Sequence, residues 1–215
     1  MNFSSVTSRD TPLAYTPLTQ IQPLLGFKIA RILQAVLPKE VFCWISRSTI
    51  MLQSIIFPQR WPYWTRLTEK LYVGGMPLKN WGHVNAINDL GIAAILSINE
   101  DFEFNKQLWA DPIQPNEWEE HNISFLNLSI PDLQPLSPVI LAQAVEFVFR
   151  QHLAGKKILI HCTGGRGRSV SAAIASLVRI NGIRLEEAFH NTTHARSQAM
   201  LSQQQIHSII EWSNS

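Results

Sequence analysis

The hydrophobic pattern of the N-terminal quarter of the chain predicts two helices. Between positions 24 and 37, polar residues recur every three positions (Lys28, Arg31 and Gln34), and apolar residues fill the opposite side. This spacing is that of a helix with one apolar stripe. Positions 41–57 are strongly apolar and are also of helical length. A proline between the two segments ends the first one, because proline is poorly tolerated in a helix interior.

From about position 71 the pattern changes to short apolar runs that alternate with amphipathic segments. Such alternation predicts an α/β fold with helices on both faces of a central sheet. We expect strands at 71–73, 92–98, 123–128 and 157–160, and helices at 81–90, 138–152, 169–180, 185–190 and 203–212. The chain then divides into a flexible Ser/Thr/Pro-rich tail (1–23), an amphipathic and apolar helical extension (24–62) and an α/β domain (63–215).

The composition is that of a globular protein, with 46% hydrophobic and 16% charged residues. Two cysteines, Cys43 and Cys162, are too few for a disulfide framework, which favours the cytoplasm or another reducing compartment. We expect no secretory signal, because the first 20 residues lack its basic and apolar regions. We expect no membrane span either, because the longest uncharged stretch of the extension (48–59) is shorter than the ~20 residues required.

The net charge of +2 is unevenly distributed along the chain. Residues 1–70 hold eight basic and three acidic side chains, whereas residues 71–215 hold ten basic and thirteen acidic ones. The basic extension (24–62) suggests peripheral contact with an anionic membrane. Nucleic acid is not expected, because no Lys/Arg run or stacking module accompanies the charge. In the alternative interpretation, which is the commoner role of apolar helical stripes, these helices pack on the following domain.

A glycine-rich loop between a buried strand and a helix carries the candidate chemistry. Cys162 ends the strand, and Gly164, Gly165 and Gly167 precede the helix. Unpaired N–H groups at a helix start form an anion site, and glycines let the backbone curl tightly enough to present them. The same field stabilises a thiolate at Cys162, which makes it a nucleophile. Arg168, six residues on, can hold two phosphoryl oxygens with its planar fork.

Other phosphate loops and metal sites do not fit this segment. It contains neither Gly-x4-Gly-Lys-Ser/Thr nor Gly-x-Gly-x-x-Gly, which argues against nucleoside-triphosphate and dinucleotide binding. His161 and Cys162 are adjacent, and no second cysteine lies near them in the sequence, so a metal site is not expected. The chemistry needs no metal and no organic cofactor.

The segment His161-Cys162-x-x-Gly165-x-x-Arg168-Ser169 resembles the signature of the protein tyrosine and dual-specificity phosphatase superfamily. This resemblance implies a dual-specificity-phosphatase-like α/β fold over residues 63–215. It also implies hydrolysis of phosphomonoesters through a phosphocysteine intermediate at Cys162.

The same resemblance implies a general acid on a loop before the signature. Asp132 is the candidate, because it follows the expected strand at 123–128, and Asp111, in a proline-rich loop, is its rival. Ser169 would donate a hydrogen bond to the sulfur and help the thiolate to leave. His161, as a buried strand residue, would order the loop through hydrogen bonds and would not act as an acid or a base.

From about Tyr63 to the C-terminus, the chain resembles the mitochondrial-type phosphatidylglycerophosphate phosphatases and their bacterial and plant relatives. This implies a phospholipid headgroup as substrate, either phosphatidylglycerophosphate or a phosphoinositide, and in a eukaryote a peripheral place on the mitochondrial inner membrane. Four segments carry the resemblance: Leu71-Tyr-Val-Gly-Gly-Met-Pro-Leu78, Asn99-Glu-Asp-Phe-Glu103, the loop His161–Ser169 with its extra basic residue Arg166, and Arg196-Ser197 followed by Gln205.

Three positions depart from this narrower family. Thr163 stands where these enzymes usually carry lysine, which would make the pocket rim less basic. Asp101 replaces a glutamate, and Ser202-Gln203-Gln204 replaces Arg-Pro-Gly. These changes leave the chemistry intact and bear on the headgroup.

The resemblance also implies roles around the loop. Arg166 would be a second fixed charge at the loop mouth, suited to a substrate with an additional phosphate. Glu100 and Glu103 would position Arg166 or accept hydroxyl groups of a sugar or glycerol. Arg196 would pair with these acids or with the substrate, and Gln205 would orient water.

Three alternatives to a lipid phosphatase remain at this point. A phosphatase for phosphotyrosine or phosphothreonine in proteins would use the same loop. A catalytically silent phosphate-binding module is disfavoured, because Cys162, Arg168 and Asp132 are all present. Sulfur transfer of the rhodanese type also uses a cysteine loop, but the six-residue step to the arginine and the upstream aspartate fit a phosphatase better.

Overall fold

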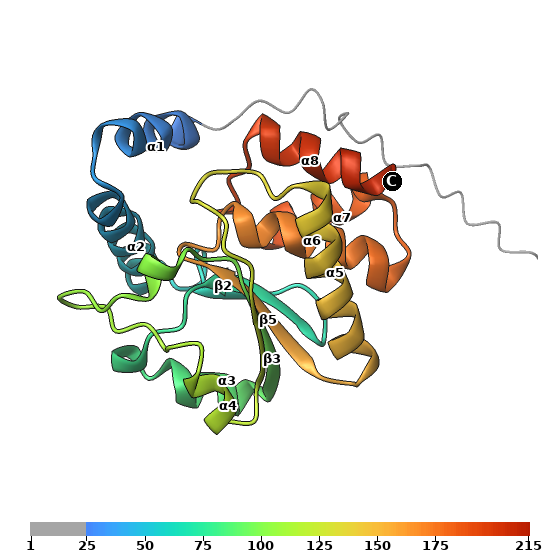
Figure 1. Ribbon diagram of the computed structural model, residues 1–215, viewed down its shortest axis with the longest axis horizontal. Helices are drawn as coiled ribbons and strands as arrows, with labels where there is room; N and C mark the ends of the chain where they lie inside the picture. Colours follow the sequence, from blue (N-terminus) through green and yellow to red (C-terminus); the bar gives the residue numbers. More distant parts are fainter. Residues whose placement is uncertain (1–24) are drawn as a thin grey trace, which may run out of the picture.

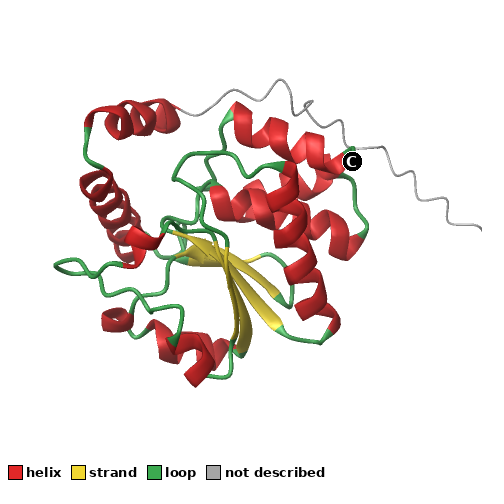
Figure 2. Cartoon of the chain, viewed as in Figure 1, coloured by secondary structure: helices red, strands yellow, loops and turns green. Residues whose placement is uncertain are grey.

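The centre of the molecule is a five-stranded mixed β-sheet (Figures 1 and 2). The computed structural model describes residues 25–215, and the side chains from residue 28 onward, so that the expected tail (1–23) lies outside the described residues. The strand order is β1-β2-β5-β3-β4; β1 is antiparallel to β2, and the other pairs are parallel. The strands are β1 (Trp64–Arg66), β2 (Leu71–Gly75), β3 (Ile92–Ser97), β4 (Ser124–Asn127) and β5 (Lys157–Cys162).

Helices cover both faces of this sheet, which confirms the α/β fold predicted from the sequence (Figure 1). Along the central strand β5, Ile158 and Ile160 enter one core and Leu159 enters the other, as the two-residue period of a strand requires. One face packs against α5 (Pro138–Leu153), α6 (Arg168–Asn181), α7 (Leu185–Ala195) and α8 (Gln203–Ser213), and the other against α3 (His83–Leu90) and α4 (Glu117–Glu120).

Three loops with candidate site residues leave the sheet at the same end of the strands, the carboxyl-terminal end. Because β3, β4 and β5 are parallel, their carboxyl ends lie side by side. The loop after β5 leads into α6, the loop after β3 leads into the short 3-10 helix η3 (Asp101–Phe104), and the loop after β4 contains Asp132. Open parallel sheets bind their ligands at this end. A second 3-10 helix, η2 (Lys79–Trp81), follows β2.

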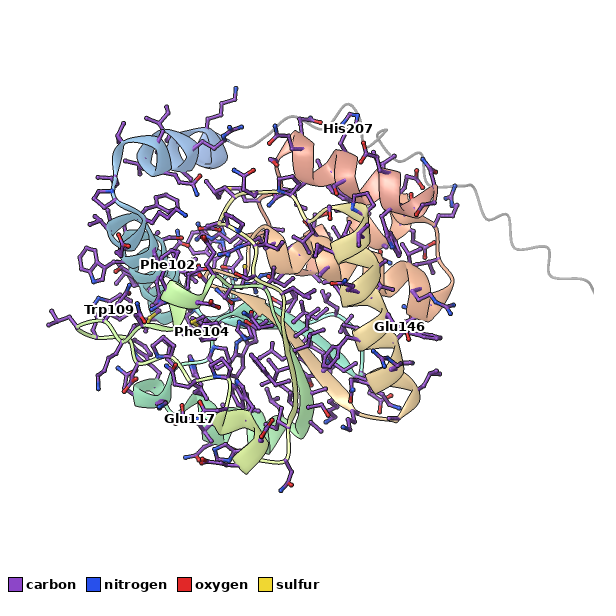
Figure 3. All side chains as sticks on the ribbon, in the orientation of Figure 1. Phe102, Phe104, Trp109, Glu117, Glu146 and His207 are labelled. Atoms are coloured by element: carbon purple, nitrogen blue, oxygen red, sulfur yellow. The ribbon has the colours of Figure 1, made fainter. Side chains whose placement is uncertain are left out.

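The N-terminal extension is a helical hairpin of α1 (Leu25–Val36) and α2 (Lys39–Ile56), as the sequence predicted. Figure 1 shows both helices, in blue, beside the β-sheet domain. Phe102 of η3 lies next to α2 (Figure 3), so the hairpin packs against the carboxyl-terminal end of the sheet, where the three loops meet. Within residues 25–215, every helix is too short or too polar to cross a membrane. The buried residues of α2 are Phe42, Cys43, Arg47, Ile50 and Met51.

Candidate active site

Cys162 lies at the base of the loop that joins β5 to α6, and its side chain is buried. Its Sγ accepts the backbone N–H of Gly165 at 3.2 Å, and Ser169 Oγ lies 3.4 Å away. An N–H donor and the N-terminus of α6 both stabilise negative charge on the sulfur. Ser169 is therefore placed where it can donate a hydrogen bond to a thiolate.

The loop needs glycine at Gly165 for two reasons. Its φ of +65° is a left-handed conformation, and a Cβ atom there would overlap the carbonyl carbon of Gly74. At Gly164, an added Cβ would overlap Cδ1 of Ile50 in α2, so the hairpin packs directly on the loop. At Gly167, an added Cβ would lie 3.0 Å from the side-chain amide of Gln205.

Arg168 is completely buried and is held in one orientation by several acceptors. Its two terminal nitrogens donate side by side to Glu103, at 2.7 and 2.9 Å. It also donates to the carbonyl of Ile130 at 2.8 Å and to Thr163 at 3.3 Å, and it pairs with Asp132 Oδ1 at 3.0 Å. Burial alone would lower the pKa of Arg168, but the two carboxylates raise it well above its usual value. The guanidinium is therefore charged and fixed before any phosphate arrives.

The sequence predicted that Glu103 positions Arg166, but Glu103 holds Arg168 instead. Its carboxylate also accepts the hydroxyl of Thr163 and the N–H of Glu100, which forms a capping box at the start of η3. Burial acts to raise the pKa of Glu103, but Arg168 lowers it overall, so the carboxylate stays ionised. Glu100 points elsewhere and pairs with Lys39 of the hairpin at 3.3 Å.

Asp132 lies beside Arg168 on the loop after β4, with 22% of its side chain exposed. Burial raises the pKa of Asp132, and the charge of Glu103 adds to this, whereas Arg168 opposes it. The adjacent Leu133 has a φ of +63° and donates its N–H to Asp132 Oδ1 at 2.9 Å. Such a strained turn next to a functional group is typical of active sites. A carboxyl group with a raised pKa, near the nucleophile, is suited to general acid catalysis.

Thr163 and His161 are both buried, and neither side chain lines the cavity around Cys162. Thr163 accepts a hydrogen bond from Asn99 at 2.8 Å and donates its hydroxyl to Glu103. The threonine that stands here in place of the relatives' lysine therefore supports Arg168 and does not form part of the pocket rim, contrary to expectation. Burial lowers the pKa of His161 to about 3, an effect that the backbone of Cys162 only partly offsets. Among the described residues, neither of its ring nitrogens has a hydrogen-bond partner of good geometry, contrary to the expected ordering of the loop by this ring.

The two remaining arginines contact groups that the sequence did not predict, although Arg166 lies at the loop mouth as expected. Arg166 reaches the loop mouth, where its guanidinium donates to Gln53 of α2, and burial lowers its pKa. Within residues 25–215, Arg196 pairs with no carboxylate and instead donates to the carbonyl of Gly165 and to Thr65, the latter at 2.8 Å. Burial lowers the pKa of Arg196 to about 9. Arg196 therefore ties the phosphate loop to β1.

Gln205 lies at the cavity wall, but its amide is already engaged. Its Oε1 accepts the N–H of Ser202 at 2.9 Å, and its Nε2 donates to the carbonyl of Gln134 at 3.2 Å. A role in orienting water stays a prediction. The rival acid Asp111 pairs with Lys106 at 3.0 Å, and it does not line the cavity around Cys162.

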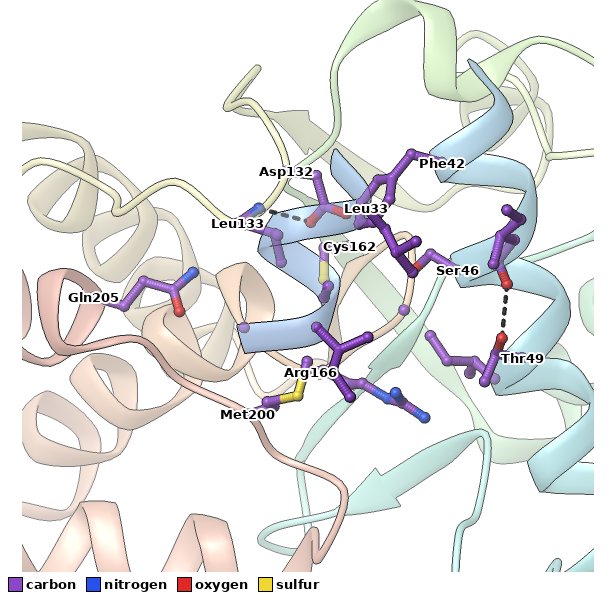
Figure 4. A pocket seen from close by; sticks show the side chains of 16 residues that line it. Leu33, Phe42, Ser46, Thr49, Asp132, Leu133, Cys162, Arg166, Met200 and Gln205 are labelled. Carbon is purple, nitrogen blue, oxygen red and sulfur yellow. Dashed lines mark hydrogen bonds between the residues drawn. The ribbon is translucent and has the colours of Figure 1, made fainter. Parts of the chain in front are cut away.

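A cavity of about 180 Å³ opens above Cys162 (Figure 4). Figure 4 shows Asp132 and Arg166 around the sulfur, with Met200 and Gln205 on one side and α2 on the other. The hairpin supplies a largely apolar wall: Ile29, Ala30, Leu33, Phe42, Ile45, Ser46, Thr49 and Ile50. The sequence did not predict these residues at the site, because periodicity shows that a helix has an apolar face but not what that face contacts.

Comparisons with known proteins agree with this geometry. Residues 83–215 match the family model "Dual specificity phosphatase, catalytic domain". Phosphatidylglycerophosphate phosphatase PTPMT1 of Arabidopsis thaliana is 27% identical over 155 residues, which cover 71% of this chain and 42% of that protein. Phosphatidylglycerophosphatase and protein-tyrosine phosphatase 1 of Mus musculus is 23% identical over 181 residues, 84% of this chain and 91% of that protein. The chain thus spans less than half of the Arabidopsis relative and most of the mouse one.

Solved structures show the same fold. The active form of Tk-PTP has a TM-score of 0.62 and 27% identity, and the match covers 72% of this chain and 98% of that one. PTPMT1 in complex with PI(5)P has a TM-score of 0.63 and 22% identity, and the match covers 71% of this chain and 95% of that one. The family model begins at residue 83, so the hairpin lies outside the matched segment.

Proposed function

This chain belongs to the family of dual specificity phosphatase catalytic domains, and we propose that it hydrolyses a phosphomonoester on a phospholipid headgroup. The lipid is phosphatidylglycerophosphate or a phosphoinositide. Relatives named for phosphatidylglycerophosphate, and a structural neighbour solved with PI(5)P, support this substrate class. The cavity beside Cys162 carries the proposal, because its hairpin wall is largely apolar.

The geometry supports a two-step mechanism at Cys162. The phosphoryl oxygens bind to the loop N–H groups and to Arg168, and the sulfur attacks phosphorus in line. The P–O bond to the lipid breaks as Asp132 gives its proton to the departing oxygen. Asp132 then takes a proton from water, which attacks the phosphocysteine and releases inorganic phosphate and the thiolate. Ser169, 3.4 Å from the sulfur, stabilises the thiolate that leaves.

The substrate phosphate and its apolar tail would occupy different parts of one cavity. Gly164, Arg166 and Gly167 line its loop side, whereas Leu33, Ile45 and other hairpin residues line its apolar side. A phosphate next to an apolar surface matches a lipid whose phosphorylated headgroup is attached to hydrocarbon. A free sugar phosphate or a hydrophilic peptide would leave this apolar surface in contact with water.

The hairpin also supports peripheral contact with an anionic membrane through residues 24–62. The hairpin exposes large apolar side chains, for example Ile32 (64%), Leu52 (58%) and Ile55 (56%), and α1 also exposes Lys28 and Arg31. Apolar and basic side chains together are typical of helices that lie in the membrane interface. Both cysteines are free, which is consistent with a membrane that faces a reducing compartment.

A substrate panel with the full-length protein tests the proposed function. We expect phosphate release from phosphatidylglycerophosphate or a phosphoinositide in vesicles to exceed release from their deacylated headgroups and from phosphotyrosine peptides. Cys162→Ser should abolish all turnover. Faster turnover of peptides than of every lipid would instead identify a protein phosphatase, and residual turnover by Cys162→Ser would exclude the phosphocysteine mechanism.

Membrane contact is tested separately by co-sedimentation with phosphatidylglycerol vesicles. Ile32→Glu and Ile55→Glu should each weaken binding, because they place a charge on the proposed contact surface. Val139→Glu is the matched control, since Val139 is 68% exposed on α5 and outside the hairpin. Equal effects of all three substitutions would contradict contact through the hairpin.

A further inference from the structure

The hairpin is linked to three parts of the active site by hydrogen bonds. From α1, Gln34 donates to the carbonyl of Asp132 at 2.8 Å. From α2, Gln53 accepts from the guanidinium of Arg166, and Arg47 donates to the carbonyl of Glu103 at 2.7 Å. The first two links involve partly buried side chains, but the third is made by an arginine that is 1% exposed. Arg47 therefore requires a separate explanation.

The surroundings of Arg47 contain little that compensates a buried charge. One terminal nitrogen donates to Glu103 O and lies 3.5 Å from the Met76 sulfur and 3.7 Å from the Cys43 sulfur. The other donates to Gln107 Oε1 at 3.2 Å. Within the described residues, Nε has no partner and none of the salt bridges involves Arg47. Burying a guanidinium without a carboxylate is costly, so a purely structural position would favour an apolar residue here.

Among residues 25–215, the backbone group that Arg47 holds belongs to Glu103, the residue that also holds the phosphate clamp Arg168. The Glu103 carboxylate meets Arg168 with two parallel hydrogen bonds, while the Glu103 carbonyl meets Arg47. Glu103 is thus held from its side chain by α6 and from its backbone by α2. It sits in η3, a four-residue 3-10 helix, which has few hydrogen bonds of its own to define its place.

We propose that Arg47 is a positioning residue, which sets the orientation of Arg168 through Glu103. The inference rests on the proposed phosphatase function, and it makes the hairpin a part of the active site and not only a cover. Arg168 would meet the phosphoryl oxygens most strongly in the transition state, so a small displacement of Glu103 lowers the rate more than it weakens substrate binding. Arg47 itself touches no substrate.

The test compares full-length Arg47→Met and Arg47→Lys with the wild type, using 4-nitrophenyl phosphate. We expect Arg47→Met to lower kcat by about tenfold, with KM changed less than threefold and the melting temperature showing a folded protein. Arg47→Lys keeps the charge and one donor, so its loss in kcat should be about threefold. Arg150→Met is the matched control, because Arg150 lies exposed on α5 and pairs with Glu146 (labelled in Figure 3).

A double-mutant cycle shows whether Arg47 acts through Glu103. In a Glu103→Gln background the orientation of Arg168 is already disturbed, so Arg47→Met should change kcat less than threefold. If Arg47→Met does not fold, Arg47→Lys takes its place in the same cycle and should then leave kcat unchanged in the Glu103→Gln background. The proposal would be overturned if the effects of the two substitutions were independent and multiplied. It would also be overturned if Arg47→Met, or Arg47→Lys where Arg47→Met does not fold, had the same kcat as Arg150→Met.

Direct binding of vanadate, followed by calorimetry, separates this inference from the proposed function. Vanadate occupies the loop without turnover, so Arg168 can be probed even if no lipid is hydrolysed. We expect the vanadate affinity of Arg47→Met to fall about tenfold, and that of Arg150→Met to stay at the wild-type value. If the wild type binds vanadate but hydrolyses no lipid, the lipid substrate fails while the role of Arg47 stands. An unchanged affinity in Arg47→Met would overturn that role.

Discussion

Replacing Glu103 by glutamine would remove the negative charge from a bidentate ion pair in which both side chains are at most 1% exposed. Breaking a buried pair typically costs 3–5 kcal/mol. Glutamine keeps one oxygen for Arg168, and Asp132 remains 3.0 Å from that guanidinium, so we expect a smaller loss of about 2–3 kcal/mol. For a domain of this size, that loss lowers the melting temperature by roughly 5–10 °C.

The pH dependence of this loss has a defined sign. The folded state lowers the pKa of Glu103, so its stabilisation is fully present above the unfolded value of about 4.3 and disappears as pH falls through the folded value. Melting curves of the wild type and Glu103→Gln should therefore differ by a constant amount between pH 5 and 7. The difference should shrink below about pH 4, because the wild-type carboxylate then becomes protonated.

Glu146→Gln provides the matched control, since Glu146 is 59% exposed and forms an ion pair on the surface of α5. Its melting temperature should stay within about 1 °C of the wild type. Turnover of 4-nitrophenyl phosphate should fall about tenfold in Glu103→Gln, because Arg168 loses one of its two anchors. A pH-independent difference in melting temperature, or a Glu103→Gln enzyme as active and as stable as Glu146→Gln, would refute this reasoning.

Three further predictions follow from single features of the structure. Asp132→Asn should lower kcat about 100-fold on alkyl phosphates but only a few-fold on 4-nitrophenyl phosphate, whose leaving group needs no proton. It should also remove the fall in kcat that occurs as pH rises through the raised pKa of Asp132. Equal losses on both substrates would argue against Asp132 as the acid. Cys43, whose pKa burial raises to about 11, should resist iodoacetamide at pH 7.5 in folded Cys162→Ser and react after unfolding, and rapid labelling of the folded variant would contradict this. Gly165→Ala should lower the free energy of unfolding, measured with urea, by more than Gly182→Ala, for which about 1–2 kcal/mol is expected. Both positions have positive φ, but of the two only Gly165 has a backbone neighbour that an added Cβ would overlap. Equal losses would show that the overlap relaxes at no cost.

The fold could be predicted because its signals are local. Each long helix and each buried strand has a hydrophobic period that the sequence displays, as in the run at 92–98 that forms β3. The prediction missed the shortest elements. β1 has three residues, and α4 and η3 have four each, which is too short for a hydrophobic period to repeat. Their existence depends on tertiary hydrogen bonds, such as the pairing of β1 with β2.

The candidate site could be predicted only where its residues are contiguous in the chain. Cys162, Arg168 and Ser169 share one loop, so their spacing indicates their chemistry. The partner of Arg168 lies 65 positions earlier, and no local pattern distinguishes a Glu103 that holds Arg168 from one that holds Arg166. Arg196 was misassigned for the same reason, because its acceptors are backbone carbonyls and the hydroxyl of Thr65, which a sequence motif does not reveal.

The two interpretations of the helical extension, membrane contact and packing on the domain, are compatible because the hairpin is apolar on two sides. Ile50 and Met51 are buried against the domain, whereas Leu52 and Ile55 are more than half exposed. A helix that only completed a core would expose polar residues on its outer side. The cavity lies between the hairpin and the phosphate loop, where Leu33 and Ile45 line it together with Cys162. A lipid in the proposed reaction could therefore keep its hydrocarbon along the hairpin while its phosphate reaches the sulfur, and the exposed apolar and basic side chains of the hairpin and its buried Arg47 would serve one reaction.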